Sequence, residues 1–331
     1  MVIRDKLITL GADVAHASGL TALSGVTAAG SIFMLHSVVG QNIRQLRLSE
    51  HSSAGFLGAV LHYYQREGFA FVTMDEALRR VEQGREADKF ISFTFDDGYR
   101  DNLEIVLPLL ERYACPFTVY ITTDIIERQA LYWWGGLRAI VQNNDTIDYE
   151  PIGRRLPAHT LAQKVGTYYT ISSHVRSGAS RPADVKRLMA RHGVSNNDLL
   201  DQDMLSREDL HTLSRHPLVT IGGHTQSHRA LRQLSLEEAR QEIEANRAYL
   251  QDCIEEPVRH FAYPFGDQQS CGEREFSLVE ALGFATGVTT RRGNLAGLSN
   301  PFAMSRVLFS GMRESIGYIE LQRTGLMGRG T

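Results

Sequence analysis

Short apolar runs alternate with helical patterns along most of the chain. The runs are rich in β-branched and aromatic residues, and they predict strands at residues 31–37, 69–72, 89–95, 116–121, 218–223, 260–265, 284–290 and 303–309. Continuous apolar runs of this kind are typical of strands covered on both faces, as in a parallel sheet or barrel. Polar residues are therefore concentrated in the segments between the predicted strands.

Those segments carry readable helix ends. Thr73 with Glu76, and Ser235 with Glu238, have the spacing of capping boxes, and each pair opens a helical pattern. Glycines stand where two of the helices should end, at Gly68 and Gly84. Repeated strand–helix units imply right-handed crossovers, so the pattern predicts an α/β fold with a barrel-like sheet. Functional groups are expected at the carboxyl ends of its strands.

One long stretch breaks this rhythm. Residues 130–215 are helical in pattern, rich in polar residues and without a convincing strand, and we interpret them as an insertion. The predicted division is an N-terminal helical segment (1–29), a first part of the barrel (30–129), the helical insertion (130–215), and a second part of the barrel with a C-terminal helix (216–331).

Composition excludes several classes of protein. The 331 residues carry a net charge of −3, so no global basic field favours nucleic acid. Cys115, Cys253 and Cys271 are an odd set without CxxC spacing, which indicates neither a disulfide framework nor a zinc–thiolate site and fits a reducing compartment. Residues 17–43 lack charged side chains, but their many hydroxyls and glycines argue against a membrane segment or signal peptide. We therefore expect a cytoplasmic protein.

The sharpest chemical signal is the sequence SFTFDDG. A strand ends in Asp96 and Asp97, followed at once by Gly98. Two adjacent carboxylates are electrostatically costly unless a cation or a proton offsets their charge, and a metal ion would do so. The alternative is that Asp-Asp-Gly is only a turn, because these residues are common turn formers.

A second signal is GGHTQSH, in which His224 and His228 follow a predicted strand. Residues four apart share a face if the segment turns helically, so both imidazoles could reach one ion. A chance HxxxH is the alternative in a chain with 12 histidines. The position at a strand end favours a site, because the aspartates emerge at the same edge.

Together these residues offer one carboxylate and two imidazoles. Such a set leaves coordination positions open for water and substrate, as in a catalytic zinc-type site. If Asp97 binds the metal, Asp96 is free to remove a proton from the water that the ion activates.

TFDDG, HTQSH and FAYPFG, in this order, resemble the successive motifs of the polysaccharide deacetylase family, carbohydrate esterase family four, which includes nodulation-type chitooligosaccharide deacetylases. The resemblance spans roughly residues 30–310. It implies a distorted (β/α) barrel of about seven parallel strands and metal-assisted removal of acetyl groups. The implied base is Asp96, and the implied ligands of a divalent metal are Asp97, His224 and His228. Zinc is expected, with cobalt, nickel and manganese as alternatives.

The third motif, FAYPFGD, resembles the family's groove wall. There the backbone N–H of the residue after proline, Phe265 here, helps to hold the oxyanion. A packing corner is the alternative reading of this turn. Tyr263 in the same motif and Tyr99 after the DDG are further candidates for contact with substrate. Five aromatic residues of the insertion could stack on sugars or fill the core: Tyr132, Trp133, Trp134, Tyr168 and Tyr169.

Two departures from the family pattern are visible. Many members carry an arginine in the third motif that orients the base, but Ala262 stands at that place; Arg306 is the candidate replacement, with a structural salt bridge as the alternative. Many members also have a histidine near the C-terminus as general acid, but no histidine follows His260. The segment IFMLHSV resembles a permuted branch in which the histidine comes from the N-terminal side. We therefore predict that His36 is the general acid, unless it is only structural.

The sequence thus predicts a deacetylase that acts on an N-acetylated oligo- or polysaccharide, N-acetyl being favoured over O-acetyl. A metal hydrolase of another amide or ester on the same fold is an alternative, and so is a non-catalytic carbohydrate-binding relative. A two-histidine, one-carboxylate set also occurs in non-haem iron oxygenases. The second aspartate and the strand–helix rhythm favour hydrolysis.

Overall fold

The computed structural model describes residues 2–18, 30–40, 48–84, 88–295, 298 and 300–324. Most of the uncharged stretch 17–43 lies outside these ranges. Within the described part of the chain, no helix combines the length and the apolar character needed to cross a membrane.

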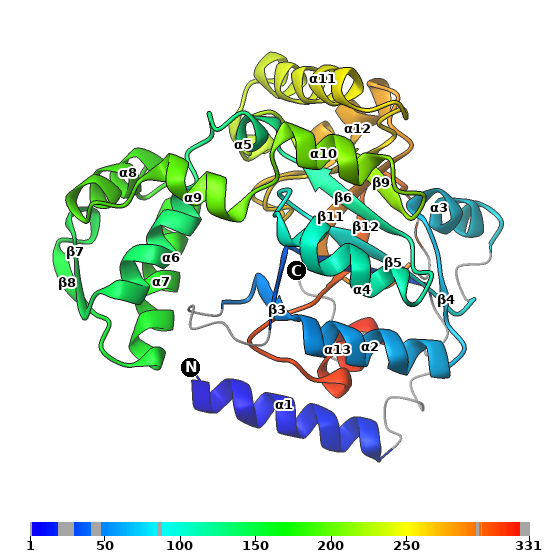
Figure 1. Cartoon of the computed structure of the whole chain (residues 1–331), viewed down its shortest axis with the longest axis horizontal. Coiled ribbons are helices and arrows are strands. Elements are labelled where there is room, and N and C mark those ends of the chain that lie inside the picture. Colours follow the sequence, from blue (N-terminus) through cyan, green and yellow to red (C-terminus); the bar gives the residue numbers. More distant parts are fainter. Residues whose placement is uncertain are drawn as a thin grey trace.

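Seven parallel strands form a closed barrel, as the sequence predicts (Figure 1). Around the ring their order is β1 (Ser31–Leu35), β12 (Met304–Leu308), β11 (Thr286–Arg292), β10 (His260–Ala262), β9 (Val219–Gly223), β6 (Phe117–Ile121) and β5 (Phe90–Phe95). The short strand β4 (Ala70–Phe71) pairs with the beginning of β5. Each predicted strand is present, within a few residues of its predicted bounds.

The ring closes through β1, which pairs with strands from distant parts of the chain. Phe33 lies opposite Val307 of β12 and opposite Phe93 of β5. Because every pairing is parallel, all seven strands end at the same rim. The segments that follow β1, β5 and β9 are therefore neighbours in space.

Helices surround the barrel (Figure 1). They are α1 (Val2–Ala17), α2 (Ala54–Arg66), α3 (Met74–Glu82), α4 (Leu107–Glu111), α5 (Thr123–Ile126), α10 (Arg207–Ser214), α11 (Leu236–Cys253), α12 (Glu273–Ala281) and α13 (Ile316–Arg323). Helix α10 falls within the range predicted for the insertion but packs on β9 and α11. Ser235 and Glu238 form the predicted capping box, and the Thr73 hydroxyl accepts a hydrogen bond from the Glu76 N–H. Gly68 and Gly84 end helices with φ of +77° and +66°, which glycine adopts without a Cβ penalty.

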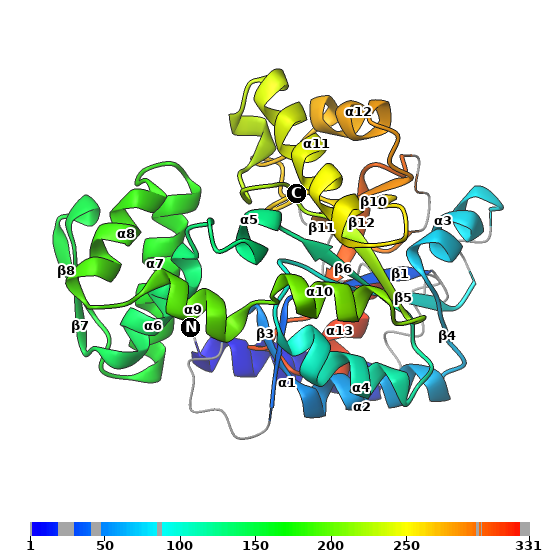
Figure 2. The same ribbon diagram turned by 45° about the horizontal axis from the view of Figure 1, so that its top comes forward.

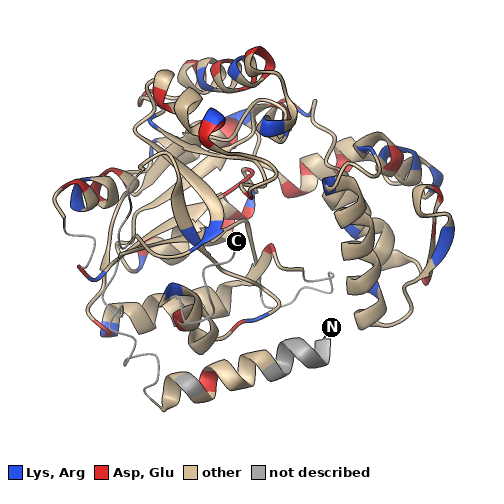
Figure 3. Cartoon of the chain, turned by 180° about the vertical axis from the view of Figure 1, so that it is seen from behind, with Lys and Arg blue, Asp and Glu red and all other residues tan. Residues whose placement is uncertain are grey.

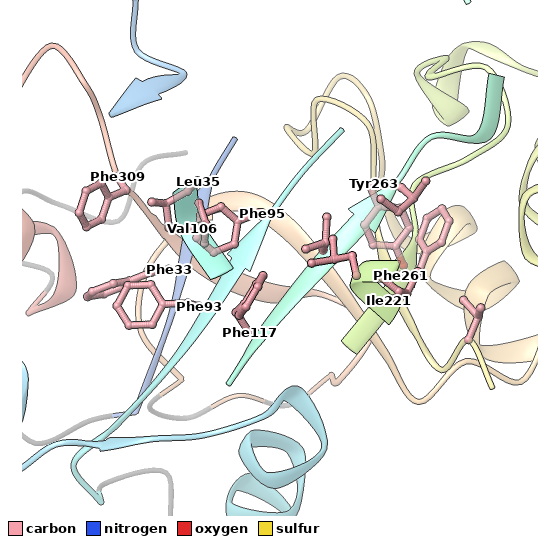
Figure 4. Close-up of a cluster of buried hydrophobic side chains, with 14 of the residues drawn as sticks. Phe33, Leu35, Phe93, Phe95, Val106, Phe117, Ile221, Phe261, Tyr263 and Phe309 are labelled. Atoms are coloured by element: carbon pink, nitrogen blue, oxygen red, sulfur yellow. The ribbon is translucent and has the colours of Figure 1, made fainter. Parts of the chain in front are cut away.

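Two apolar layers explain the strand pattern. Alternate residues of a strand point to opposite faces, so Phe93 and Phe95 of β5 face the surrounding helices, whereas Phe90 and Thr94 face the barrel interior. Figure 4 shows the outer layer, which continues across Phe117 and Phe261. Both faces are covered, and this is why the strands read as continuous apolar runs. Charged residues lie mainly on the helices and loops outside (Figure 3).

The insertion forms a lobe beside the barrel, with α6 (Trp133–Asn143), α7 (Leu161–Arg176), α8 (Pro182–Arg191) and α9 (Asn196–Asp203) (Figure 2). It has its own apolar core, which includes Leu137, Ile140, Val165, Ile171 and Leu188. The boundaries at residues 130 and 215 stay predictions.

The prediction that this stretch contains no strand is wrong. An antiparallel hairpin joins α6 to α7, with β7 (Thr146–Tyr149) and β8 (Arg154–Pro157). Only one face of the hairpin is buried, by residues such as Ile147 and Leu156, and charged residues occupy the other. Its strands therefore lack the apolar runs that identify the barrel strands.

The described part of the N-terminal segment lies against the end of the chain. Helix α1 packs on α13, where Gly317 brings the two backbones together, since a Cβ there would lie 2.5 Å from the carbonyl oxygen of Ala12. The outer face of α1 leaves Leu10 and Val14 exposed.

Candidate active site

Asp96 and Asp97 follow β5 at the rim of the barrel. Asp97 and Gly98 both have positive φ, +77° and +87°, so the segment is a tight turn as well as a chemical motif. Asp96 is 2% exposed and Asp97 4% exposed. The turn buries two adjacent carboxylates, which calls for compensating charge.

His224 and His228 lie in the loop after β9, beside the two aspartates. The loop is not helical, because Thr225 and His228 have φ of +63° and +58°. The expectation that a helical turn brings the imidazoles together is therefore wrong. The Thr225 hydroxyl accepts the N–H of His228 at 3.0 Å and stabilises the irregular turn instead.

The geometry of Asp97, His224 and His228 fits a metal ion. Asp97 Oδ1 lies 3.4 Å from His224 Nε2 and 3.2 Å from His228 Nε2. Ligand atoms about 2.0 to 2.2 Å from a tetrahedral ion are separated by about 3.3 to 3.6 Å. The carbonyl oxygen of Ala262 lies 2.7 Å from His224 Nδ1, which leaves Nε2 for the ion. Asp97 Oδ1 is buried without a hydrogen-bond partner among the described residues.

Electrostatics favour the ionised form of Asp97. Burial raises its pKa, but the neighbouring His228 and His224 outweigh burial and hold the pKa well below its usual range. Burial lowers the pKa of His228, and the net shift is downward despite Asp97. Burial lowers the pKa of His224 too, but its hydrogen bond with Asp97 and the charges of Asp96 and Asp97 raise that pKa overall. The site thus presents Asp97 as an anion, the form that binds a metal.

Arg306 makes a bidentate ion pair with Asp96. Its Nη1 and Nη2 donate to the two carboxylate oxygens at 2.7 Å each, and both side chains are almost wholly buried. Arg306 is held by Thr94 Oγ1 at 3.1 Å and by the carbonyl oxygen of Thr289 at 2.9 Å. Burial opposes ionisation of Asp96, but the guanidinium dominates and lowers its pKa. Asp96 therefore stays a charged acceptor beside the triad.

His36 stands at the carboxyl end of β1, at the same rim. Its backbone carbonyl accepts a hydrogen bond from Asn102 Nδ2 at 3.0 Å, and its Nδ1 is buried without a partner among the described residues. Burial and closer groups have the largest effects on the pKa values of Asp96 and Asp97, and positive charge on His36 lowers both values further. The imidazole is thus within electrostatic range of both carboxylates.

Helix α11 supports the loop that carries His224 and His228, here called the histidine loop. This support was not predicted from the sequence. Asn246 donates to the carbonyl oxygens of Ile121 and Thr225 at 2.9 and 2.7 Å, and its Oδ1 accepts the His224 N–H at 3.2 Å. Glu242 accepts the Ser227 N–H at 2.9 Å. The sequence does contain a signal for this role. Glu242 and Asn246 are four residues apart and interrupt the otherwise apolar stripe on the buried face of α11.

A groove of about 660 Å³ runs from His228 along the boundary between the barrel and the insertion. Trp134 and Phe265 flank His228, with ring centroids 5.0 and 4.9 Å from the imidazole. The Phe265 N–H donates no hydrogen bond to a backbone carbonyl of the described residues. Aromatic walls of this kind suit the apolar faces of sugars.

Most of the insertion's aromatic candidates belong to the core instead. Tyr132, Trp133 and Tyr168 are at most 7% exposed, although one edge of Trp133 reaches the groove. Tyr169 is partly buried and donates to Ser49 Oγ at 2.8 Å. Trp134 is the member of the set that flanks His228 of the candidate triad.

Two residues predicted to contact substrate are buried and are not among the residues that line the groove. Tyr99 is 2% exposed and lies behind Trp134, whose Nε1–H it accepts at 3.0 Å. Tyr263 faces the outer apolar layer and donates to the carbonyl oxygen of Phe302 at 2.9 Å (Figure 4). Alternation along β10 explains this, because Ala262 faces the interior and its neighbours face outward.

Backbone strain gathers at this site. Six described residues other than glycine have positive φ, and four of them are Asp97, Thr225, His228 and Phe265. Such conformations are unfavourable for residues with a side chain and persist where the surroundings impose them, often at active sites.

Solved structures share the fold at low sequence identity. A deacetylase from Streptococcus pyogenes, PplD in complex with acetate, is 16% identical with a TM-score of 0.55, covering 86% of this chain and 93% of that chain. IcaB from Ammonifex degensii is 17% identical with a TM-score of 0.55, over 88% and 97%. The deacetylase domain of BpsB from Bordetella bronchiseptica is 13% identical with a TM-score of 0.51, over 85% and 95%. No curated protein matches the sequence.

The sequence also matches a family model directly. The polysaccharide deacetylase model aligns with residues 83–152 and 162–282, which is more than half of the chain. The two aspartates and the two histidines of the rim lie within these ranges. The chain therefore belongs to the polysaccharide deacetylase family and is a deacetylase enzyme.

Proposed function

We propose that this enzyme hydrolyses N-acetyl groups on an oligo- or polysaccharide and depends on a divalent metal held by Asp97, His224 and His228. The observation that carries the proposal is the buried Asp96–Arg306 pair directly beside this triad. A purely structural metal site does not require a second carboxylate such as Asp96, oriented by its own counterion Arg306. A hydrolase needs one as a base.

Zinc is the ion that we favour. One carboxylate and two imidazoles with separations of 3.2 and 3.4 Å suit its tetrahedral preference, and cobalt, nickel and manganese are alternatives. Bound there, the ion would polarise the acetyl carbonyl and acidify a water molecule.

The chain's own residues supply the proton transfers. Asp96, ionised and fixed by Arg306, takes a proton from the attacking water. His36, on the neighbouring strand of the rim, protonates the departing amine. The backbone N–H of Phe265 donates to the oxyanion that forms at the acetyl carbon.

An N-acetylated sugar is the substrate that fits these groups. Amine departure from an amide requires a proton, which gives His36 a purpose that an ester would not. Trp134 and Phe265 offer aromatic faces beside the triad. The relative from S. pyogenes was solved with acetate, which is the acid product of a deacetylation.

The test is release of acetate from N-acetylglucosamine oligomers. We expect chelation to abolish release and added zinc or cobalt to restore it, and His224→Ala to lose both metal and activity. Acetate release that survives both chelation and His224→Ala would contradict the metal-dependent mechanism. Tight binding of oligomers with no release under any metal would indicate a non-catalytic relative.

A further inference from the structure

The groove beside the triad carries positive charge, although the chain as a whole has a net charge of −3. Its lining includes three arginines, Arg176, Arg181 and Arg229, and one carboxylate, Asp267. They come from separate segments: the end of α7, the start of α8, the histidine loop and the loop after β10. An excess of positive charge in a concave surface attracts anionic ligands.

Arg176 and Asp267 largely neutralise one another. Arg176 Nη2 lies 2.8 Å from Asp267 Oδ2, and its guanidinium lies over the Phe265 ring at 5.6 Å. The pair extends the aromatic wall outward from the triad. The positive excess of the groove therefore comes from Arg181 and Arg229.

Arg181 has only a loose carboxylate contact. Its Nη2 is 3.8 Å from Asp184 Oδ1, and its side chain is 77% exposed. That carboxylate is engaged more closely by Arg187 at 2.6 Å and by the Arg181 backbone N–H at 2.7 Å. The guanidinium of Arg181 therefore stays available to a ligand in the groove.

Arg229, in the histidine loop, is also weakly paired. It directly follows His228, its side chain is 54% exposed, and its Nη2 is 4.0 Å from Glu238 Oε1. Glu238 accepts hydrogen bonds from the hydroxyl and N–H of Ser235 at 2.8 and 2.9 Å, as the cap of α11. Two weakly paired guanidinium groups thus line one groove, Arg181 from the start of α8 and Arg229 from the loop after β9.

We infer that Arg181 and Arg229 form a subsite for a carboxylate or phosphate on the sugar chain, so that the enzyme prefers acidic N-acetylated carbohydrates to neutral ones. The inference rests on the proposed function and further specifies that the carbohydrate substrate is negatively charged. Arginine suits the role because its planar fork binds carboxylate and phosphate through two parallel hydrogen bonds. An acetamido sugar at the triad and an acidic group farther along the groove would then be held together.

Binding measured without turnover tests this inference separately from catalysis. The protein is zinc-loaded Asp96→Asn, and isothermal titration calorimetry compares three ligands. These are a neutral N-acetylglucosamine tetrasaccharide, a tetrasaccharide that alternates N-acetylglucosamine with glucuronic acid, and an N-acetylglucosamine disaccharide 1-phosphate. We expect at least one acidic ligand to bind about tenfold more tightly than the neutral one. The two acidic ligands identify which anion is recognised.

Adding Arg181→Gln and Arg229→Gln together should reduce that preference to about twofold or less. Adding Arg207→Gln and Arg240→Gln together instead, two arginines outside the groove, should keep the preference and controls for the loss of two positive charges. Raising salt from about 0.05 to 0.5 M should weaken acidic ligands selectively. Equal affinities for all three ligands, or a preference that survives the double substitution, would overturn the inference. If the preference is found but the native enzyme releases no acetate, the proposed function fails and the subsite stands.

Discussion

Arg306 and Asp96 form the most completely buried ion pair of the rim, although 210 positions separate them in sequence. Alternation along β12 turns Arg306 into the barrel, and alternation along β5 turns Thr94 inward below Asp96. Through β1, Val307 is level with Phe93, so Arg306 starts below the rim and its long side chain reaches past Thr94 to Asp96.

Arg306→Lys should therefore impair catalysis more than folding. Lysine keeps the charge but cannot hold both oxygens of Asp96, so we expect kcat to fall about 10²-fold with zinc content unchanged. Arg306→Ala should instead destabilise the protein by about 3 to 5 kcal/mol, because it strands a buried carboxylate. A lysine variant with full kcat would show that the pair is only structural.

The two aspartates should separate cleanly by metal content. Asp96→Asn should retain zinc and lose most turnover, because the amide keeps the shape and removes the base. Asp97→Asn should lose zinc. Metal analysis of the purified variants, alongside acetate release, distinguishes the roles, and the opposite pattern would mean that the assignments are reversed.

His36→Ala tests the general acid. We expect zinc binding to persist and deacetylation of an N-acetyl substrate to fall about 10² to 10⁴-fold. An activated ester should be affected less, because its leaving group needs no proton. Equal losses on the amide and the ester would assign His36 a structural role.

Asn246→Ala should weaken the site through the histidine loop. The substitution removes two hydrogen bonds to loop and strand carbonyls and one from the His224 N–H, so we expect zinc affinity to fall about 10 to 100-fold. Competition with a chromogenic chelator measures this change. Arg240→Gln on the same helix is the control, and unchanged zinc affinity in Asn246→Ala would show that the loop holds its shape alone.

Asp101 should make stability depend on pH. Burial raises its pKa to about 7, against hydrogen bonds from Ser37 and Asn102. The folded state then holds a proton that the unfolded chain releases from its ordinary pKa of 3.8 upward, so the free energy of unfolding falls as pH rises between these values.

Between pH 5 and pH 7 this contribution is on the order of 2 to 3 kcal/mol, at about 1.4 kcal/mol per pH unit. Asn cannot ionise, so in Asp101→Asn the free energy of unfolding should not show this decrease between pH 5 and pH 7. Urea unfolding of both proteins at several pH values gives the comparison. Parallel pH profiles would mean that Asp101 ionises normally in the fold.

The barrel could be predicted because its strands are covered on both faces, which leaves runs such as 89–95 apolar throughout. The rim motifs could be placed because each follows such a run. The orientation of Tyr263 could have been predicted, because a residue one step beyond Ala262 faces outward. The positive φ of Thr225 and His228 could not be foreseen, because residue type favours neither conformation and the surrounding contacts impose both.

The other differences also have physical causes. The hairpin in the insertion buries only one face, so polar residues interrupt its strands and the strands were not predicted from the sequence. Tyr99 was expected in the groove because it follows Asp-Asp-Gly, but Trp134 comes from the insertion and covers it. Contacts between segments far apart in sequence decide which of two adjacent aromatic rings reaches solvent.

The place of β1 between β12 and β5 has a consequence for biosynthesis. A ribosome delivers β1, β5 and β6 early, but the first strand has only one of its two neighbours until residues near 308 have left the exit tunnel. Parallel pairing over such a separation is slow, because a long loop must close before its contacts form. A nascent chain therefore carries an open sheet edge for most of its synthesis. We expect this interval to be the stage at which the protein is most prone to aggregate and most dependent on chaperones.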